Sequence, residues 1–160
     1  MTIAIGQSLP DNTIHIKHDG KVIETSLAEW SKDKSVILIT VPGAFTPTCS
    51  EKHLPGYIAH ADKLKAKGID AIGCLSVNDV HVMAAWGKHS GADGKVDMIA
   101  DANGLAAQAM GIDVVSTPVL GSNRAARLAL VATSGIVTQI YKEEPAQFEI
   151  SSAEYVLERL

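Results

Sequence analysis

The chain has 160 residues, of which 46% are hydrophobic and 20% charged, and its formal net charge is -4 at pH 7. This size and composition are typical of one globular domain with its own core and exclude a disordered chain. No apolar run reaches the about 18 residues that a membrane-spanning helix needs. The acidic balance, without a basic stripe, argues against a nucleic-acid partner. We therefore expect one domain over residues 1–160 that binds neither membrane nor nucleic acid.

The first third of the chain predicts a hairpin and then a buried strand. Residues 13–17 alternate apolar and polar side chains, Asp19-Gly20 is a turn signal, and residues 22–25 supply the partner strand. Residues 26–30 predict a short helical turn. Residues 35–41, S-V-I-L-I-T-V, are almost continuously apolar, which is typical of a strand covered on both faces.

A helix is predicted to follow this buried strand. Thr46 is a suitable N-cap and Pro47 a suitable first helical residue, because proline needs no N–H donor there. We expect the helix to run to Lys67 and to end at Gly68. Pro55 lies inside it and is expected to kink it, since proline removes one backbone hydrogen bond.

The remaining chain continues to alternate strands and helices. Strands are predicted at 69–77 and 98–100 and in a hairpin of 126–132 with 136–141. Helices are predicted at 80–88, capped by Asn78 or Asp79, at 105–110, and at 151–160, capped by Ser151 or Ser152. Residues 90–95 and 114–123 are expected to be irregular. This order predicts an α/β fold with one central mixed β-sheet and helices on both faces.

Cys49 lies where the buried strand at 35–41 passes into the predicted helix. In the first helical turn, unpaired N–H groups and the positive end of the helix dipole favour a thiolate over a thiol. Thr46 is expected to direct its hydroxyl into the same pocket, and Pro42 to shield that pocket from water. Such a slot suits a small polar substrate with two adjacent oxygen atoms.

These residues also form a recognisable motif. P-G-A-F-T-P-T-C at 42–49 matches the P-x-x-x-T-x-x-C signature of the peroxiredoxins, and the longer string G-A-F-T-P-T-C-S-E-K-H-L-P-G resembles their type II, or peroxiredoxin-5-like, subfamily. The resemblance covers roughly residues 3–141. It continues at C-L-S-V-N-D (74–79), M-A-A-W (83–86), M-G (110–111), R-L-A-L-V (127–131) and Gly135.

The resemblance implies a thioredoxin-like fold and the thiol-dependent reduction of hydrogen peroxide or alkyl hydroperoxides in antioxidant defence. It implies that Cys49 is the peroxidatic cysteine, which becomes sulfenic acid, while Thr46 holds the peroxide and Pro42 shields it. Arg127 corresponds to the arginine beside the thiolate. Arg124 is a competing candidate, and we prefer Arg127 because it directly precedes the apolar strand. The resemblance implies no cofactor.

A thiol must then reduce the sulfenic acid. The resemblance implies a resolving role for Cys74, but a buried cysteine equally often packs as a small hydrophobic side chain. A Cys49–Cys74 disulfide would also require the helix to unwind locally. The other candidate reductants are glutathione with glutaredoxin, or thioredoxin. The resemblance further implies a homodimer, with contacts expected around Phe45 and in residues 86–94.

Two other interpretations of these residues compete with the enzyme. His53, four positions after Cys49, shares its helical face and packs near the helix or tunes the pocket; two ligands do not make a zinc site. The chain is alternatively a thioredoxin-fold sensor in which Cys49 relays oxidation to a partner. A sensor needs a reactive thiol but no hydroxyl to orient a peroxide, so Thr46 favours the enzyme.

Localisation is predicted from the N-terminus and the cysteines. M-T-I-A-I-G-Q-S-L-P has no basic region followed by a long apolar stretch, so no secretory signal is expected. Two cysteines are too few for a disulfide framework. We therefore expect a cytoplasmic protein.

Overall fold

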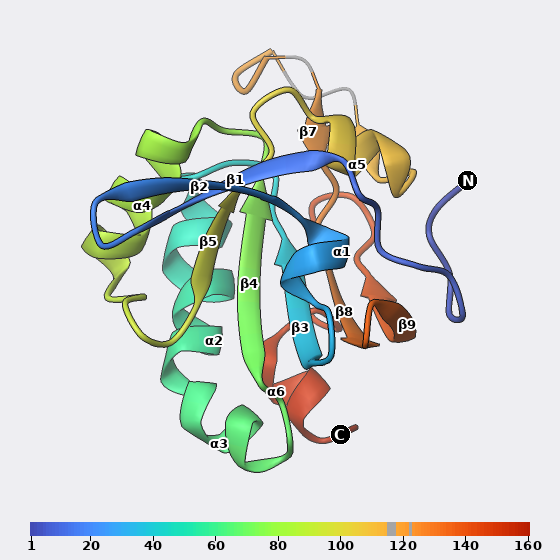
Figure 1. Cartoon of the computed structure of the whole chain (residues 1–160). Helices are drawn as coiled ribbons and strands as arrows, with labels where there is room; N and C mark the ends of the chain where they lie inside the picture. The colour runs from blue at the N-terminus through green and yellow to red at the C-terminus, as the bar shows by residue number, and fades with distance from the viewer. Residues whose placement is uncertain (115–117, 122) are drawn as a thin grey trace.

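The computed structural model describes residues 1–114, 118–121 and 123–160 (Figure 1). Within these residues seven strands form one mixed sheet in the order β2-β1-β5-β4-β3-β8-β9. The strands of this sheet are β1 (Thr13–His18), β2 (Lys21–Ser26), β3 (Ser35–Thr40), β4 (Ala71–Ser76), β5 (Asp97–Ala100), β8 (Leu128–Thr133) and β9 (Ile136–Lys142). Strands β3, β4 and β5 are parallel, while β1 and β8 run antiparallel to their neighbours β5 and β3. The predicted mixed sheet is confirmed.

Six α-helices and one π-helix accompany the sheet in the described residues. They are α1 (Leu27–Trp30), the π-helix η1 (Cys49–His53), α2 (Leu54–Ala59), α3 (Ala61–Ala66), α4 (Val80–Ser90), α5 (Leu105–Ala109) and α6 (Ala153–Leu157). None of these helices has the length and apolar character required to cross a membrane.

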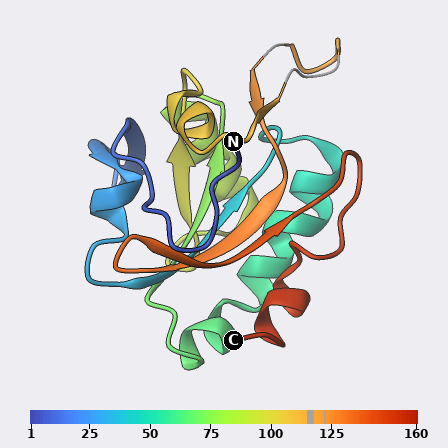
Figure 2. The same cartoon turned by 90° about the vertical axis from the view of Figure 1, so that its right-hand side faces the viewer.

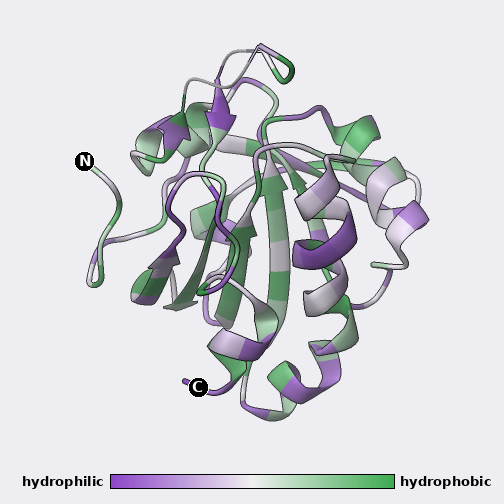
Figure 3. Cartoon of the chain, turned by 180° about the vertical axis from the view of Figure 1, so that it is seen from behind, coloured by the Kyte–Doolittle hydropathy of each residue, from purple (hydrophilic) through white to green (hydrophobic). Residues whose placement is uncertain are grey.

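The strands at the centre of the sheet send alternate side chains to two separate cores. In β3, Ile37 and Ile39 pack on one face, where α2, α3, α4 and α6 contribute their buried side chains. Val36 and Leu38 pack on the other face with α1, α5 and the N-terminal segment. The two helical layers are seen in Figures 1 and 2. Strands covered on both faces explain the unbroken apolar runs, and Figure 3 shows the strands as mainly hydrophobic.

The predicted single helix from Thr46 to Lys67 is wrong, because the structure divides it into η1, α2 and α3, with His60 between the last two. Pro47 is the first helical residue as predicted. The helix widens just before Pro55: the Leu54 N–H donates to the Cys49 carbonyl, five residues back. Pro55 has no N–H, and the wide turn ends just ahead of it.

Other predicted boundaries shift by a few residues. Asp79 caps α4, accepting from the N–H groups of residues 81 and 82, and Ser152 caps α6. Helix α4 extends to Ser90, beyond the predicted end, and α6 stops at Leu157.

The segment predicted to be irregular, 114–123, lies partly outside the described residues, namely at 115–117 and 122. At its two ends the chain forms a small antiparallel pair, β6 (Asp113–Val114) with β7 (Arg124–Ala125), which the sequence analysis did not predict. This pair projects beyond the main sheet in Figure 2.

Candidate active site

Cys49 occupies the beginning of the active-site helix. It is the third helical residue after Thr46 and the first residue of η1, and it is fully buried. The Ser50 N–H donates to the Thr46 carbonyl at 2.8 Å, which closes the first turn. The sulfur therefore lies in the helical turn where the macrodipole favours negative charge.

The Arg127 guanidinium contacts this sulfur directly. Its Nη2 donates to Cys49 Sγ at 3.1 Å. Arg127 immediately precedes β8, whose Leu128 pairs with Thr40 at the end of β3. The Thr40 hydroxyl also donates to the Ala126 carbonyl at 2.6 Å. The β3–β8 register thus brings Arg127 to the sheet edge from which the Cys49 helix starts.

Arg124, the competing candidate, donates to backbone carbonyls instead. Its Nη1 donates to the Val77 carbonyl at 2.9 Å, while Nε and Nη2 donate to the Leu120 carbonyl at 3.0 and 2.8 Å. These bonds tie together the loops around the end of β4. Arg127 therefore contacts the sulfur, whereas the described hydrogen bonds of Arg124 go to backbone carbonyls.

The loop between β3 and the helix is held by Asn78. The Asn78 side-chain oxygen accepts from the Ala44 N–H at 3.0 Å and from the Ser76 hydroxyl at 2.6 Å. Pro42 is half-buried at the start of this loop, and Phe45 adopts a positive φ of 61°. The S-V-N-D segment therefore supports the Cys49 loop from the neighbouring strand.

Thr46 is half-buried, and its hydroxyl does not cap the helix as predicted. The hydroxyl donates to the Gly43 carbonyl at 2.7 Å rather than accepting a helical N–H. Because its single proton is committed to the backbone, the Thr46 oxygen keeps its lone pairs for accepting a hydrogen bond from a substrate. Hydrogen peroxide and alkyl hydroperoxides each have an O–H that can donate to such an acceptor.

His53 forms a bridge that the sequence analysis did not specify. Arg127 Nη1 lies 2.9 Å from His53 Nδ1, and His53 Nε2 lies 3.0 Å from the Ser151 carbonyl. Arginine offers only donors and a carbonyl only accepts, so Nδ1 must be unprotonated and Nε2 must carry the hydrogen. Burial, with a smaller contribution from Arg127, lowers the pKa of His53 to about 3. His53 is therefore neutral.

Glu143 and Ser151 complete the network and were missed by sequence reasoning. The Glu143 carboxylate accepts from the N–H groups of residues 149, 150 and 151 at 2.6, 3.3 and 2.9 Å, and from the Ser151 hydroxyl at 2.7 Å. Burial alone would raise the pKa of Glu143, but these hydrogen bonds together lower it. The Phe148 ring packs against Arg127 and His53: it lies 5.9 Å from the Arg127 guanidinium carbon and 5.1 Å from the His53 ring.

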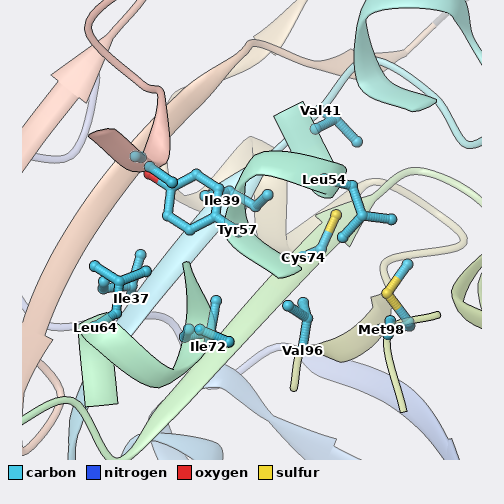
Figure 4. Packing of buried hydrophobic residues seen from close by; sticks show 14 of the residues in the cluster. Ile37, Ile39, Val41, Leu54, Tyr57, Leu64, Ile72, Cys74, Val96 and Met98 are labelled. Carbon is cyan, nitrogen blue, oxygen red and sulfur yellow. The ribbon is translucent and has the colours of Figure 1, made fainter. Parts of the chain in front are cut away.

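Cys74 lies inside the sheet, in β4, paired with Ile39 of β3 and Met98 of β5. It is fully buried in the same core as Cys49, and Figure 4 shows its sulfur directed toward Leu54 of the active-site helix. Burial first, and then the proximity of Cys49, raises the pKa of the Cys74 thiol well above its usual value. Both cysteines are free thiols.

In residues 1–114, 118–121 and 123–160 no three His, Cys, Asp or Glu side chains gather in a way that would hold a metal ion.

Comparisons with known proteins agree with this geometry. The Redoxin family model matches residues 4–157. A chloroplastic peroxiredoxin-2E-2 of Oryza sativa subsp. japonica is 43% identical over 99% of this chain and 73% of its own length. Peroxiredoxin-2B of Arabidopsis thaliana is 41% identical over 99% of this chain and 98% of its own length. The chain belongs to the peroxiredoxin family.

The fold of this peroxiredoxin closely matches a solved relative. The structure of reduced Prx3 in complex with H2O2 from Vibrio vulnificus is 42% identical, covers 99% of both chains and superposes with a TM-score of 0.94. The predicted thioredoxin-like fold is thereby confirmed. So is the predicted activity, that of a thiol-dependent peroxidase, and the peroxiredoxin-2 names of the relatives fit the type II subfamily.

Proposed function

We propose that Cys49 is the peroxidatic cysteine of this thiol-dependent peroxidase, with Arg127 and Thr46 as its catalytic partners and Pro42 as the shield. The observation that carries the proposal is the 3.1 Å contact from Arg127 Nη2 to Cys49 Sγ. A fixed positive charge at this distance favours the thiolate, which is the nucleophilic form of cysteine. The relative solved with H2O2 supports a small peroxide as the substrate.

The reaction is a two-electron oxidation of the sulfur. The Cys49 thiolate attacks one oxygen of the hydroperoxide, an S–O bond forms, and the O–O bond breaks. The leaving oxygen takes the electron pair of that bond and one proton from the solvent, and departs as water or an alcohol. Arg127 stabilises the charge as it moves from sulfur to oxygen, and the Thr46 oxygen accepts from the peroxide O–H. Cys49 is left as sulfenic acid.

Two routes for reducing the sulfenic acid remain as proposals. An external thiol, from glutathione with glutaredoxin or from thioredoxin, condenses with Cys49–SOH to form a mixed disulfide and release water. Alternatively Cys74 forms a disulfide with Cys49, which also releases water. The raised pKa of Cys74 and its place inside the sheet disfavour attack from the folded core, so this second route needs η1 to unwind.

The sensor interpretation predicts a different use of the same thiol. A protein that only relays oxidation needs Cys49 and Arg127, whereas turnover of peroxide also uses the free lone pairs of Thr46. The hydrogen bond from the Thr46 hydroxyl to the Gly43 carbonyl, which leaves those lone pairs available, favours the enzyme.

A homodimer and a cytoplasmic location are further proposals. Phe45 is 50% exposed although its ring lies 6.3 Å from the Trp86 ring and 5.8 Å from the His89 ring, and a second copy of the chain would cover this apolar surface. The cytoplasmic location rests on the sequence analysis. Relatives of both chloroplastic and unspecified location match the chain.

Mass spectrometry of peroxide-treated protein tests these roles. With one equivalent of H2O2 and a sulfenic-acid trap, we expect the trapped adduct on the Cys49 peptide and none in Cys49→Ser. A Cys49–Cys74 disulfide formed without the trap would support internal resolution, and a glutathione adduct on Cys49 would support the external route. Oxidation confined to Cys74 would contradict the proposal.

A further inference from the structure

We propose that Glu143 is a positioning residue for peroxide reduction: its carboxylate fixes the Ser151 carbonyl, which acts through His53 to hold the Arg127 guanidinium against the Cys49 sulfur. The inference rests on the proposed roles of Cys49 and Arg127. It adds to them a buried carboxylate from the far end of the chain.

Glu143 is placed by the same hairpin that places Arg127. It follows β9, and its own N–H donates to the Arg127 carbonyl at 3.0 Å, one step beyond the Leu128–Lys142 pair of the β8–β9 ladder. The residue is only 8% exposed. The open end of the β8–β9 hairpin therefore carries both the guanidinium and the carboxylate that supports it.

The carboxylate organises the segment from residue 149 to Ser151. It accepts the four hydrogen bonds described above, two of them from Ser151 itself. Bonds from several N–H groups to one carboxylate are charge-assisted and directional, so they fix the backbone of residues 149–151. The Ser151 carbonyl starts from this fixed position, although it belongs to the next peptide group. The fully buried Ser151 then directs its carbonyl at His53 Nε2 and at the Tyr57 hydroxyl, at 3.0 and 2.8 Å. Figure 4 shows the Tyr57 ring extending toward this segment.

The Ser151 carbonyl determines which nitrogen of His53 is protonated. Because the carbonyl only accepts, it keeps the hydrogen on Nε2 and leaves Nδ1 free to accept from Arg127. If the carbonyl rotated away, either nitrogen of His53 could carry the hydrogen, and a hydrogen on Nδ1 would oppose the Arg127 N–H. The Arg127–Cys49 contact thus depends on the Glu143 carboxylate, which acts through Ser151 and His53 and not by direct contact with either side chain.

The first test compares Glu143→Gln with Asp101→Asn. Asp101 is a matched control: it is equally a buried carboxylate, 1% exposed, and accepts from the N–H groups of residues 106 and 107 at 3.1 and 2.8 Å, but it serves α5 on the opposite face of the sheet. The readouts are the rate of Cys49 oxidation by H2O2 and the pH midpoint of iodoacetamide alkylation at the Cys49 peptide. Urea unfolding measures the stability of each variant.

We expect Glu143→Gln to slow peroxide oxidation about tenfold and to move the alkylation midpoint to higher pH, since small misplacements of a catalytic group are costly. Asp101→Asn should lose stability without either change. Equal effects of both variants, or an unchanged midpoint in folded Glu143→Gln, would overturn the inference. If Glu143→Gln does not fold, Ser151→Ala removes one of the four donors and should shift the midpoint less but in the same direction; no shift would equally overturn it.

A second pair of variants separates the two hydrogen bonds of His53. His53→Asn keeps an acceptor near the Nδ1 position, and His53→Gln keeps a donor near the Nε2 position. We expect Asn to preserve more of the peroxide rate than Gln does. Adding Glu143→Gln to His53→Gln should cause no further loss, because both act through Arg127; additive losses would contradict the relay.

Alkylation needs no peroxidase activity, which separates the two possible failures. If the wild-type protein does not oxidise Cys49 with H2O2, the proposed function fails. If it does, and the alkylation midpoint ignores Glu143, only the positioning role fails.

Discussion

Arg127 Nη2 lies 3.1 Å from Cys49 Sγ, although the two residues are 78 positions apart in the chain. The contact joins the start of a helix to the start of a strand across the β3–β8 ladder. It supplies a positive charge that is fixed by the sheet rather than carried on a mobile loop. Substitutions of Arg127 should therefore change the rate of peroxide reduction more than they change the free energy of unfolding.

Replacing the guanidinium should affect chemistry far more than stability. We expect Arg127→Gln to slow the reaction of Cys49 with H2O2 by about 10²–10³-fold, the usual effect of removing one donor to a developing charge. Arg127→Lys should recover only part of this loss, because an ammonium group cannot reach Cys49 and His53 together. Stopped-flow fluorescence or competition kinetics measures the rate.

Arg124→Lys is the matched control for this arginine. Its guanidinium binds the Val77 and Leu120 carbonyls, so the variant should unfold at lower urea concentration yet keep the peroxide rate. A large loss of rate in Arg124→Lys with little effect in Arg127→Gln would exchange the two assignments.

The Thr46 oxygen is expected to matter as an acceptor. Thr46→Val keeps the shape of the side chain but removes the oxygen, and we expect a rate loss of about ten- to a hundredfold, with alkylation of Cys49 much less affected. Thr46→Ser keeps the oxygen and should retain most of the rate. If alkylation and peroxide oxidation fell equally in Thr46→Val, the residue would serve the thiolate rather than the peroxide.

Cys74 offers a test of packing against resolution. Cys74→Ser places a hydroxyl among Ile39, Leu54 and Met98, and burying a polar group without a partner should lower the free energy of unfolding by about 1–3 kcal/mol. Cys74→Ala removes the thiol without adding a polar group. Turnover of Cys74→Ala with glutathione and glutaredoxin at the wild-type rate would show that internal resolution is not obligatory. Loss of turnover with every reductant would make it obligatory.

The neutral His53 predicts a pH-dependent stability. Its pKa is lowered from 6.5 to about 3 in the folded protein, so between these values the unfolded chain binds more protons. The free energy of unfolding should therefore fall as pH falls, by about 2 kcal/mol between pH 7 and pH 5 from this residue. Urea titrations at both pH values measure the slope.

His53→Asn removes the titrating ring and provides the control. Its absolute stability should be lower, but the fall between pH 7 and pH 5 should shrink by about 2 kcal/mol. An identical slope in both proteins would mean that His53 titrates normally.

Much of the fold was predictable because the signals were local. Apolar runs at 35–41 and 69–77 gave the two central strands, and Asp79 followed by a helical pattern gave the start of α4. The wide turn of η1 was not predictable in this way, since a Pro55 inside a helical pattern is compatible with a kink, a break or a π-turn. In the structure the two residues that bound this wide turn, Cys49 and His53, both contact Arg127, and no local pattern encodes these tertiary contacts.

In the candidate site, too, the local motif was predictable and the tertiary contacts were not. Pro42, Thr46 and Cys49 form one short motif, and Arg127 was distinguished from Arg124 by the strand that follows it. Glu143 stands in a polar run beside Glu144, and nothing in the pattern separates a carboxylate that binds three N–H groups from an exposed one. Glu143 is buried and hydrogen-bonded only because residues 148–151 fold back over the end of the β8–β9 hairpin.

The most direct test is steady-state consumption of H2O2 with glutathione and glutaredoxin, or with thioredoxin, by the wild type and by Cys49→Ser. We predict many turnovers per wild-type molecule with at least one of these reductants, and none for Cys49→Ser, which should remain folded. Stoichiometric consumption by the wild type with every reductant, or undiminished turnover by Cys49→Ser, would contradict the assignment of Cys49 as the peroxidatic residue.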